Sequence, residues 1–140
     1  MKTVSIFIAA VSILIAQSAK AKPTVEANRQ FAWVEVPGTA IQLSTENPYL
    51  TQFSWYMNIN RLVREGETIV FEVASPEAQY YRVQGNCRNQ QLLVQFQGEF
   101  ESETKIVYQP VSDSWHTATG LQQRLLNFAC SNDGGTSLSR

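Results

Sequence analysis

The residue types best suited to acid–base chemistry in this chain lie together around its single histidine. Ser112, Asp113, Ser114 and His116 supply hydroxyls, a carboxylate and an imidazole, the groups used by nucleophilic hydrolases. Neighbouring side chains of an extended segment point to opposite sides, however, and catalytic triads are assembled from distant positions. The G-x-S-x-G turn is also missing from the sequence. The sequence therefore predicts no catalytic residues, and we expect His116 at a surface or strand edge beside a packed Trp115.

A row of three glutamates is the next candidate for chemistry. Glu99, Glu101 and Glu103 alternate along the chain, so in an extended segment their carboxylates share one face and would attract a hard cation or a basic partner. The row lacks the carbonyl and Asn ligands of a calcium loop, which favours a solvated strand face. One histidine and two cysteines fall short of the roughly four ligands of a structural zinc site. We predict neither a metal site nor a cofactor.

Positive charge is concentrated at four arginines, Arg61, Arg64, Arg82 and Arg88. Alternation along neighbouring strands would place some of them on an exposed face, where they would meet an acidic ligand. The alternative, scattered solubilising charge, is favoured. With 11 Lys and Arg and a net charge of −1, the chain has no basic patch for nucleic acid.

Aromatic residues make up 11% of the chain, more than one small core obviously requires. Trp33 and Phe71 lie at the centres of apolar segments and are expected in the core. Trp and Tyr are typical anchors of exposed binding patches, and one aromatic run follows a long loop. The candidate binding surface consists of Phe53, Trp55, Tyr56, Arg61 and Arg64.

The first 21 residues have the layout of a secretory signal peptide. A positive start is followed by an uncharged apolar run over 4–16, and Ala19 and Ala21 form an A-x-A cleavage site. The apolar run is shorter than the roughly 20 residues that span a bilayer, and nothing later in the chain resembles a membrane span. Cleavage removes Lys2 and Lys20, so the net charge becomes −3. We expect an exported protein, in the periplasm, outside the cell, or in the thylakoid lumen of a photosynthetic source.

The two cysteines, Cys87 and Cys130, are predicted to form a disulfide. An even cysteine count in a small exported domain favours a structural bond, and no C-x-x-C spacing supports a redox pair. Closing a loop of about 43 residues stabilises the folded chain by about 4 kcal/mol in the chain-entropy model.

The middle of the chain is predicted to form a meander of about six strands. Alternation and β-forming residues mark strands at 31–36, 53–60, 68–74, 80–86, 90–96 and 105–109, with 39–43 as a further short candidate. Turns are expected around Gly66 and at Arg88–Asn89, Gly98 begins a polar stretch, and Pro110 ends the last strand. Short connections favour antiparallel pairing.

One helix closes the chain. Thr119 and Gln122 have the spacing of a capping box, and Gly134–Gly135 is expected to end the helix. An apolar stripe at helical spacing is formed by Leu121, Leu125, Phe128 and Ala129. The predicted fold class is α+β: an antiparallel sheet with one C-terminal helix packed on it and stapled to it by the disulfide.

Several segments follow the order of features in a family of small exported domains. These are a Trp-containing strand at 31–35, a segment at 58–62, a strand pair leading to Cys87 at 82–88, a late Trp115, and a last helix with Cys130 at 125–130. Over about residues 31–131 the chain resembles the bacterial surface-adhesin protein E-like domains, although Asn86 stands where the family has Asp. The resemblance implies the same α+β fold and the binding of host matrix proteins. The expected organisation is a signal peptide at 1–21, a linker at 22–30, this domain at 31–131 and a flexible tail at 132–140.

Three classes of function remain open. The favoured one is an exported, non-catalytic binding or adhesion module whose partner is another protein or a surface ligand. The second is a periplasmic or lumenal accessory subunit, or an inhibitor-like protein, of a larger complex. The third is a small exported enzyme, which would need a concave pocket with convergent polar groups. The length of 140 residues fits one domain, and a charged fraction of only 16% argues against disorder.

Overall fold

The computed structural model of the chain describes residues 22–41 and 53–137, with side chains described as far as Asn132. The predicted signal peptide at 1–21 lies outside the described residues. The short strand expected at 39–43 is described only as far as Ile41, which forms an isolated antiparallel bridge with Phe53.

Nine strands, one 3-10 helix and one α-helix are formed by the described residues. In chain order they are β1 (Thr24–Glu26), β2 (Trp33–Glu35), β3 (Tyr56–Asn58), η2 (Ile59–Arg61), β4 (Val63–Glu65), β5 (Thr68–Ala74), β6 (Gln79–Asn86), β7 (Gln91–Ser102), β8 (Lys105–Pro110), β9 (His116–Thr117) and α2 (Leu121–Ser137). All strand pairs are antiparallel, in the order β1-β8-β7-β6-β5-β3-β2. The predicted α+β class, the helix on an antiparallel sheet and the disulfide are confirmed.

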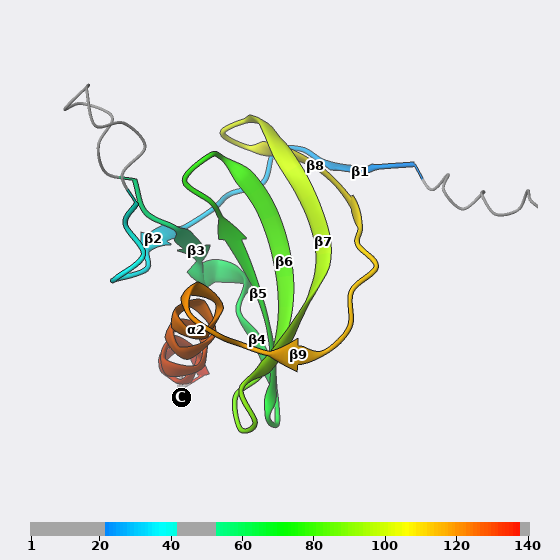
Figure 1. Cartoon of the computed structure of the whole chain (residues 1–140). Coiled ribbons are helices and arrows are strands. Elements are labelled where there is room, and N and C mark those ends of the chain that lie inside the picture. The colour runs from blue at the N-terminus through cyan, green and yellow to red at the C-terminus, as the bar shows by residue number, and fades with distance from the viewer. Residues whose placement is uncertain (1–21, 42–52, 138–140) are drawn as a thin grey trace, which may run out of the picture.

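Strands β5 to β8 form the predicted meander, which is the centre of the molecule (Figure 1). The loop before β5 has only two residues, and Gly66 takes a φ of 63° there, as the tight hairpin turns compatible with strand twist require. After β6, the side-chain oxygen of Asn86 accepts hydrogen bonds from the backbone N–H groups of Arg88 and Asn89. The turn expected at these two residues is therefore fixed by a local side chain.

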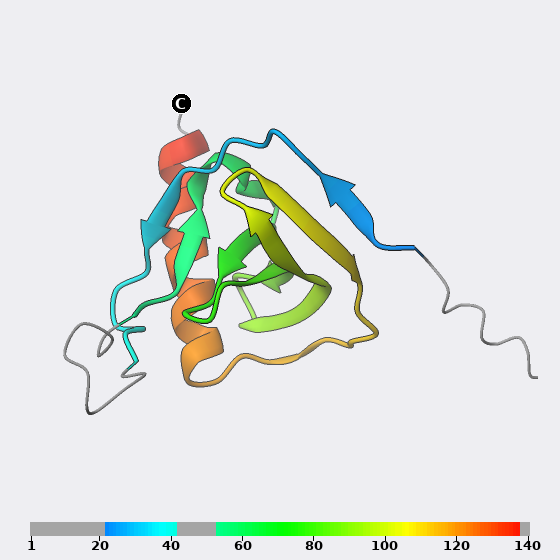
Figure 2. The same cartoon turned by 90° about the horizontal axis from the view of Figure 1, so that it is seen from above.

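The sheet is curled (Figure 1), and its long strands exchange partners along their length. Strand β5 pairs with β4 at its start and with β3 at its end, and β7 pairs with β9 at its start and with β8 beyond it. Strands β1 and β2 lie at opposite edges, and the chain between them passes over the β7–β8 turn (Figure 2). There the backbone N–H of Arg29 donates to the carbonyl of Thr104 at 2.9 Å. The N-terminal segment thus crosses one face of the sheet from edge to edge.

A β-bulge in β7 changes the face of the sheet towards which its side chains point. Val83 pairs with Val94, but Arg82 pairs with Phe96, so Gln95 is the extra residue. A bulge shifts the alternation of side chains by one position. Val94 therefore lies on the helix side, whereas Phe96 lies on the opposite face.

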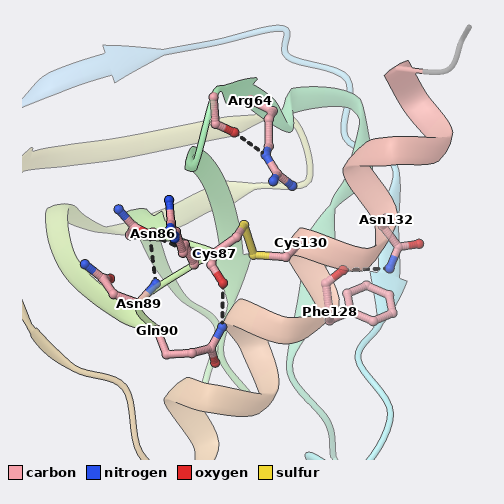
Figure 3. Close-up of a disulfide and its surroundings, with 10 residues drawn as sticks. Arg64, Asn86, Cys87, Asn89, Gln90, Phe128, Cys130 and Asn132 are labelled. Atoms are coloured by element: carbon pink, nitrogen blue, oxygen red, sulfur yellow. Dashed lines mark hydrogen bonds between the residues drawn. A yellow bond between two sulfur atoms is a disulfide. The ribbon is translucent and has the colours of Figure 1, made fainter.

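The face towards α2 carries the larger core. Its fully buried side chains include Met57, Ile69 and Phe71 from the sheet, with Leu126 and Ala129 from the helix. The predicted helical stripe is buried at Leu125 and Ala129, partly buried at Phe128 and 37% exposed at Leu121. The disulfide Cys87–Cys130 links the β6–β7 turn to the middle of α2 (Figure 3).

The opposite face has a second, aromatic core. Tyr80, Ile106 and Tyr108 are buried there, and Phe96 and Phe100 pack against them. These side chains fill the hollow of the curled sheet. Both faces of the sheet are therefore covered, one by the helix and the other by the N-terminal segment.

Several features of the chain differ from the expectations. Residues 22–30, expected to be a linker, contain β1 and the buried Arg29, because the edge of β8 is available for pairing. Strand β7 runs on to Ser102 through the stretch expected to be polar. Trp115, expected to be packed, is 42% exposed.

The helix also differs from expectation at both ends. Gly120 has a φ of 54°, a left-handed conformation that cannot be the first residue of a right-handed helix. Thr119 is therefore not the N-cap, and α2 begins at Leu121. The helix continues past Gly134–Gly135 to Ser137, which also removes part of the tail expected at 132–140.

Candidate binding surface

An open aromatic groove lies between two turns of the sheet, on the face opposite α2. Its volume is about 520 Å³. The β5–β6 turn forms one wall and the β7–β8 turn the other, while β2 and β3 supply the aromatic rings. The groove is lined by Trp33, Tyr56, Ala74, Ser75, Pro76, Ala78, Phe100, Ser102 and Glu103. We refer to it below as the aromatic groove.

The rings of the aromatic groove are held by aromatic packing behind them. Trp33 stacks on Phe31 at a centroid distance of 4.9 Å, and both rings meet the Phe100 ring nearly at right angles. Phe100 in turn contacts the buried Tyr80. Tyr56 is 39% exposed and leaves its ring at the surface. The groove thus joins fixed aromatic rings to an accessible one.

Glu72 is the centre of a polar network behind these rings, although its side chain is only 2% exposed. The guanidinium of Arg29 donates to both of its carboxylate oxygens, at 2.9 and 3.0 Å. Asn58 donates at 3.0 Å, Tyr80 at 2.5 Å and Arg82 at 3.3 Å. A carboxylate bound by this many donors is fixed in place, and it fixes the strands that carry them.

A second glutamate balances the charge of the network. Glu26 contacts Arg29 at 3.1 Å and Arg82 at 3.8 Å, and it accepts a hydrogen bond from the Tyr108 hydroxyl. Arg29 stacks over the Phe31 ring at 4.6 Å, and Arg82 lies over two further rings. Two guanidiniums and two carboxylates are therefore enclosed with aromatic faces, which favour cations.

The network shifts the pKa values of its members. Burial alone would raise the pKa of Glu72, but the hydrogen bonds from Arg29, Tyr80 and Asn58 hold it below its ordinary value. Burial and the bond to Glu72 raise the pKa of Tyr80. At neutral pH Glu72 is thus a carboxylate and Tyr80 a hydrogen-bond donor, which is the arrangement that the geometry requires.

The candidate residues from the sequence do not form one surface. Trp55 and Tyr56 point to opposite faces, because successive side chains of a strand alternate. Tyr56 lines the aromatic groove, whereas Trp55 packs beside Tyr81 on the helix side at a centroid distance of 6.0 Å. Phe53 is partly exposed in its bridge with Ile41.

The candidate arginines occupy three different settings. Arg61 is exposed at the end of η2, and Arg64 is exposed on β4, where its Nε donates to the Gly66 carbonyl. Arg88 forms an exposed ion pair with Glu67 at 2.8 Å. Arg82 is mostly buried in the network around Glu72, so neither an exposed binding role nor a solubilising role fits it.

The residues around His116 are held by backbone contacts. His116 Nδ1 lies 2.9 Å from the Ser114 carbonyl and 3.9 Å from Asp113. Asp113 accepts a hydrogen bond from the Val94 N–H, which lowers the pKa of this carboxyl. Through its hydrogen bond to the backbone of β7, Asp113 attaches the β8–β9 connection to that strand. Of the glutamate row, Glu101 pairs with Lys105 at 3.1 Å, and the part of the chain in view holds no group of three metal-ligating side chains.

Two of the three aromatic residues that line the groove, Trp33 and Phe100, were not part of the predicted surface. Trp33 was expected in the core, and Phe100 lies in the stretch expected to be polar. The Phe100 ring reaches the groove only because the bulge of β7 turns it to this face. The sequence carries no signal for either residue, because neither the edge position of β2 nor the bulge of β7 is visible in local spacing.

Comparison of the chain with family models, with curated proteins and with solved structures finds no match. The resemblance to surface-adhesin protein E-like domains therefore stays a prediction. Within the residues that the structure describes, no helix is long and apolar enough to cross a membrane.

Proposed function

We propose that this protein is an exported, non-catalytic binding module that holds a partner protein in the aromatic groove. The observation that carries the proposal is the exposed Tyr56 beside the fixed rings of Trp33 and Phe100. An adhesion role, in which the partner lies on another surface, is one form of this function.

The composition of the aromatic groove supports a protein partner. Aromatic side chains are enriched at the centres of interfaces, where they bury a large area with few rotatable bonds. Small or polar residues of the two turns form the walls, and Glu103 is the charged residue of the lining. An apolar side chain of a partner would bury against the rings, while its backbone would lie against the polar rim.

Export is supported by two features of the chain. The layout of residues 1–21 is that of a signal peptide, and Cys87 and Cys130 form a disulfide, which persists in oxidising compartments. We propose that the mature protein starts at Lys22 and meets its partner outside the cytoplasm.

Site-specific photo-crosslinking tests the proposal. A photoreactive phenylalanine analogue replaces Tyr56 in one variant and Trp115 in another, and each protein is irradiated with the envelope fraction of its source. Trp115 is the matched control because it is equally exposed but lies outside the groove. We expect a discrete protein adduct from position 56 and none of the same mass from position 115.

Competition shows whether the adduct depends on the rings of the groove. Excess unlabelled protein should abolish the adduct, whereas excess Tyr56→Ala protein should compete about tenfold less well, which corresponds to losing about 1.4 kcal/mol of binding. Identical adducts from positions 56 and 115, or equal competition by the Tyr56→Ala variant, would contradict a binding role for the groove.

A further inference from the structure

A pocket on the other face of the sheet lies under the first turns of α2. Its volume is about 190 Å³. Phe71, Val73, Val83 and Leu92, which are buried, form its base on the sheet. The rest of the lining consists of Trp55, Tyr81, Val94, Leu121, Gln122 and Leu125. The pocket shares no lining residue with the aromatic groove.

The pocket exists because α2 is seated unevenly on the sheet. In its middle the helix approaches closely, since a Cβ atom on Gly85 would come within 2.4 Å of the fully buried Leu126 side chain. The disulfide at Cys130 fixes the same region of the helix (Figure 3). At the start of the helix Leu121 is still 37% exposed. The space between the first turns and the sheet is therefore left open to solvent on one side.

The lining defines the chemistry of an occupant. Among the residues that the structure describes, none that lines the pocket has a charged side chain. A charged ligand would therefore lose its hydration without gaining a counter-ion. The polar atoms of the lining belong to Trp55, Tyr81 and Gln122, whose side chains are partly exposed. This is the pattern of small-molecule sites, an apolar base with a few polar groups that orient the ligand.

The volume of the pocket and its aromatic lining limit the class of ligand further. A dry apolar cavity of about 150 Å³ accommodates one benzene molecule, so this pocket accommodates one small ring system. Phe71, Trp55 and Tyr81 offer aromatic faces and edges to such a ring. We propose that the pocket under α2 binds one small, uncharged aromatic molecule, with its polar group towards Gln122 and Tyr81. The proposal is independent of the proposed function, because it concerns the other face of the sheet.

Methyl NMR titration with indole, benzyl alcohol and benzoate tests this site. Benzyl alcohol and benzoate have nearly the same size, but only benzoate is charged at neutral pH. We expect saturable shifts of the Val73, Val83 and Leu125 methyl groups with indole and benzyl alcohol. Binding of benzoate should be at least about tenfold weaker.

Two substitutions confine the binding to the pocket. Val94→Phe places a ring inside it, and Leu121→Trp places one at its opening; each should weaken indole binding by about tenfold or more. Val107→Phe is the matched control, since Val107 lies on β8 outside the pocket, and it should leave the affinity unchanged. Retention of the disulfide and of cooperative unfolding shows that each variant is folded. If Val94→Phe does not fold, the Leu121→Trp variant, which changes an exposed position, is the test.

Four results would overturn the proposal. They are the absence of saturable shifts, shifts centred on the Ala74 and Ala78 methyl groups of the aromatic groove, unchanged indole binding by the folded Leu121→Trp protein, and benzoate binding as tight as that of benzyl alcohol. A dimer in sedimentation together with absent indole shifts would assign the pocket to a side chain of a second copy instead.

Discussion

Glu72 organises the inner face of the sheet at the scale of single residues. Its carboxylate accepts hydrogen bonds from side chains on β3, β6 and the N-terminal segment. Loss of one member of a buried ion pair is costly, because the remaining charge stays buried without its partner. The position of the N-terminal segment across the sheet should therefore depend on this one side chain.

Glu72→Gln tests this dependence. The amide has the shape of the carboxylate but leaves the buried Arg29 guanidinium with only the partly exposed Glu26 as its counter-charge. We expect the free energy of unfolding at neutral pH to fall by about 3 kcal/mol, measured by urea denaturation with the disulfide intact. Glu67→Gln is the control, because the exposed Glu67–Arg88 pair contributes less than about 1 kcal/mol.

The same pair of proteins should differ in pH dependence. Since the pKa of Glu72 is lowered in the folded state, the unfolded state binds the proton first as the pH falls. The stabilisation is complete above the ordinary pKa of 4.5 and is lost as the pH falls through the lower value of the folded protein. The difference between wild type and Glu72→Gln should therefore shrink as the pH falls below about 4.5. A difference that is constant with pH, or no larger than that of Glu67→Gln, would contradict the role of Glu72.

The sequence carries little information about this network. Glu72 and Arg29 are 43 positions apart, and Arg29 lies in a short polar segment that is typical of a linker. Arg82 alternates with apolar residues in the way that a solvent-facing arginine does. Only the curl of the sheet, which brings both edges over one face, turns these positions inward.

At the scale of elements, α2 is attached to the sheet at its middle. Leu126 and Ala129 are fully buried there, and Cys130 lies next to them in the chain. The disulfide closes a loop that includes β7, β8 and β9. The attachment should accordingly contribute to the stability of the whole domain and hold the helix start above the pocket.

The double substitution Cys87→Ala with Cys130→Ala should lower the free energy of unfolding by about 2–4 kcal/mol, because the unfolded chain gains the conformations that the bond removes. Thermal or urea unfolding measures the loss. Hydrogen exchange of the folded variant should be fastest in α2, while β5 and β6 stay protected. Stability equal to that of wild type would show that packing at Leu126 and Ala129 alone holds the helix.

The elements divide into those that local patterns predict and those that they do not. Strand β5 has the predicted limits of 68–74, and the helix is found where apolar residues recur every three or four positions. The continuation of β7 was missed, because Gly98 and the glutamates around it are poor strand formers. The bulge at Gln95 has no local signal, since the register with β6 determines it.

At the scale of the whole molecule, one sheet presents two different surfaces. The aromatic groove lies on the face crossed by the N-terminal segment, and the apolar pocket lies under α2 on the other face. Tyr56, the first residue of β3, faces the groove, and Trp55, which precedes it, faces the pocket. An aromatic run that the sequence presents as one surface is thus divided between two.

The overall class was predictable, and the closure of the sheet was not. Short connections between 68 and 109 require an antiparallel meander, and a single amphipathic helix must then cover one face. The pairing of β1 with β8 joins positions about 80 residues apart, and such long-range pairs leave no trace in the spacing of residues. The aromatic groove combines residues from distant segments in the same way, so the sequence indicated its aromatic character and Tyr56 but not Trp33 or Phe100.

The central claim is that a partner protein binds in the aromatic groove. Hydrogen exchange of this protein, measured in its complex with the partner captured at Tyr56, tests that claim most directly. Exchange is compared between the free protein and its complex, residue segment by residue segment. Binding in the aromatic groove predicts slower exchange in β2, β3 and the β5–β6 turn, with α2 unchanged. Slower exchange confined to α2 and η2, with the segments of the groove unchanged, would contradict the account.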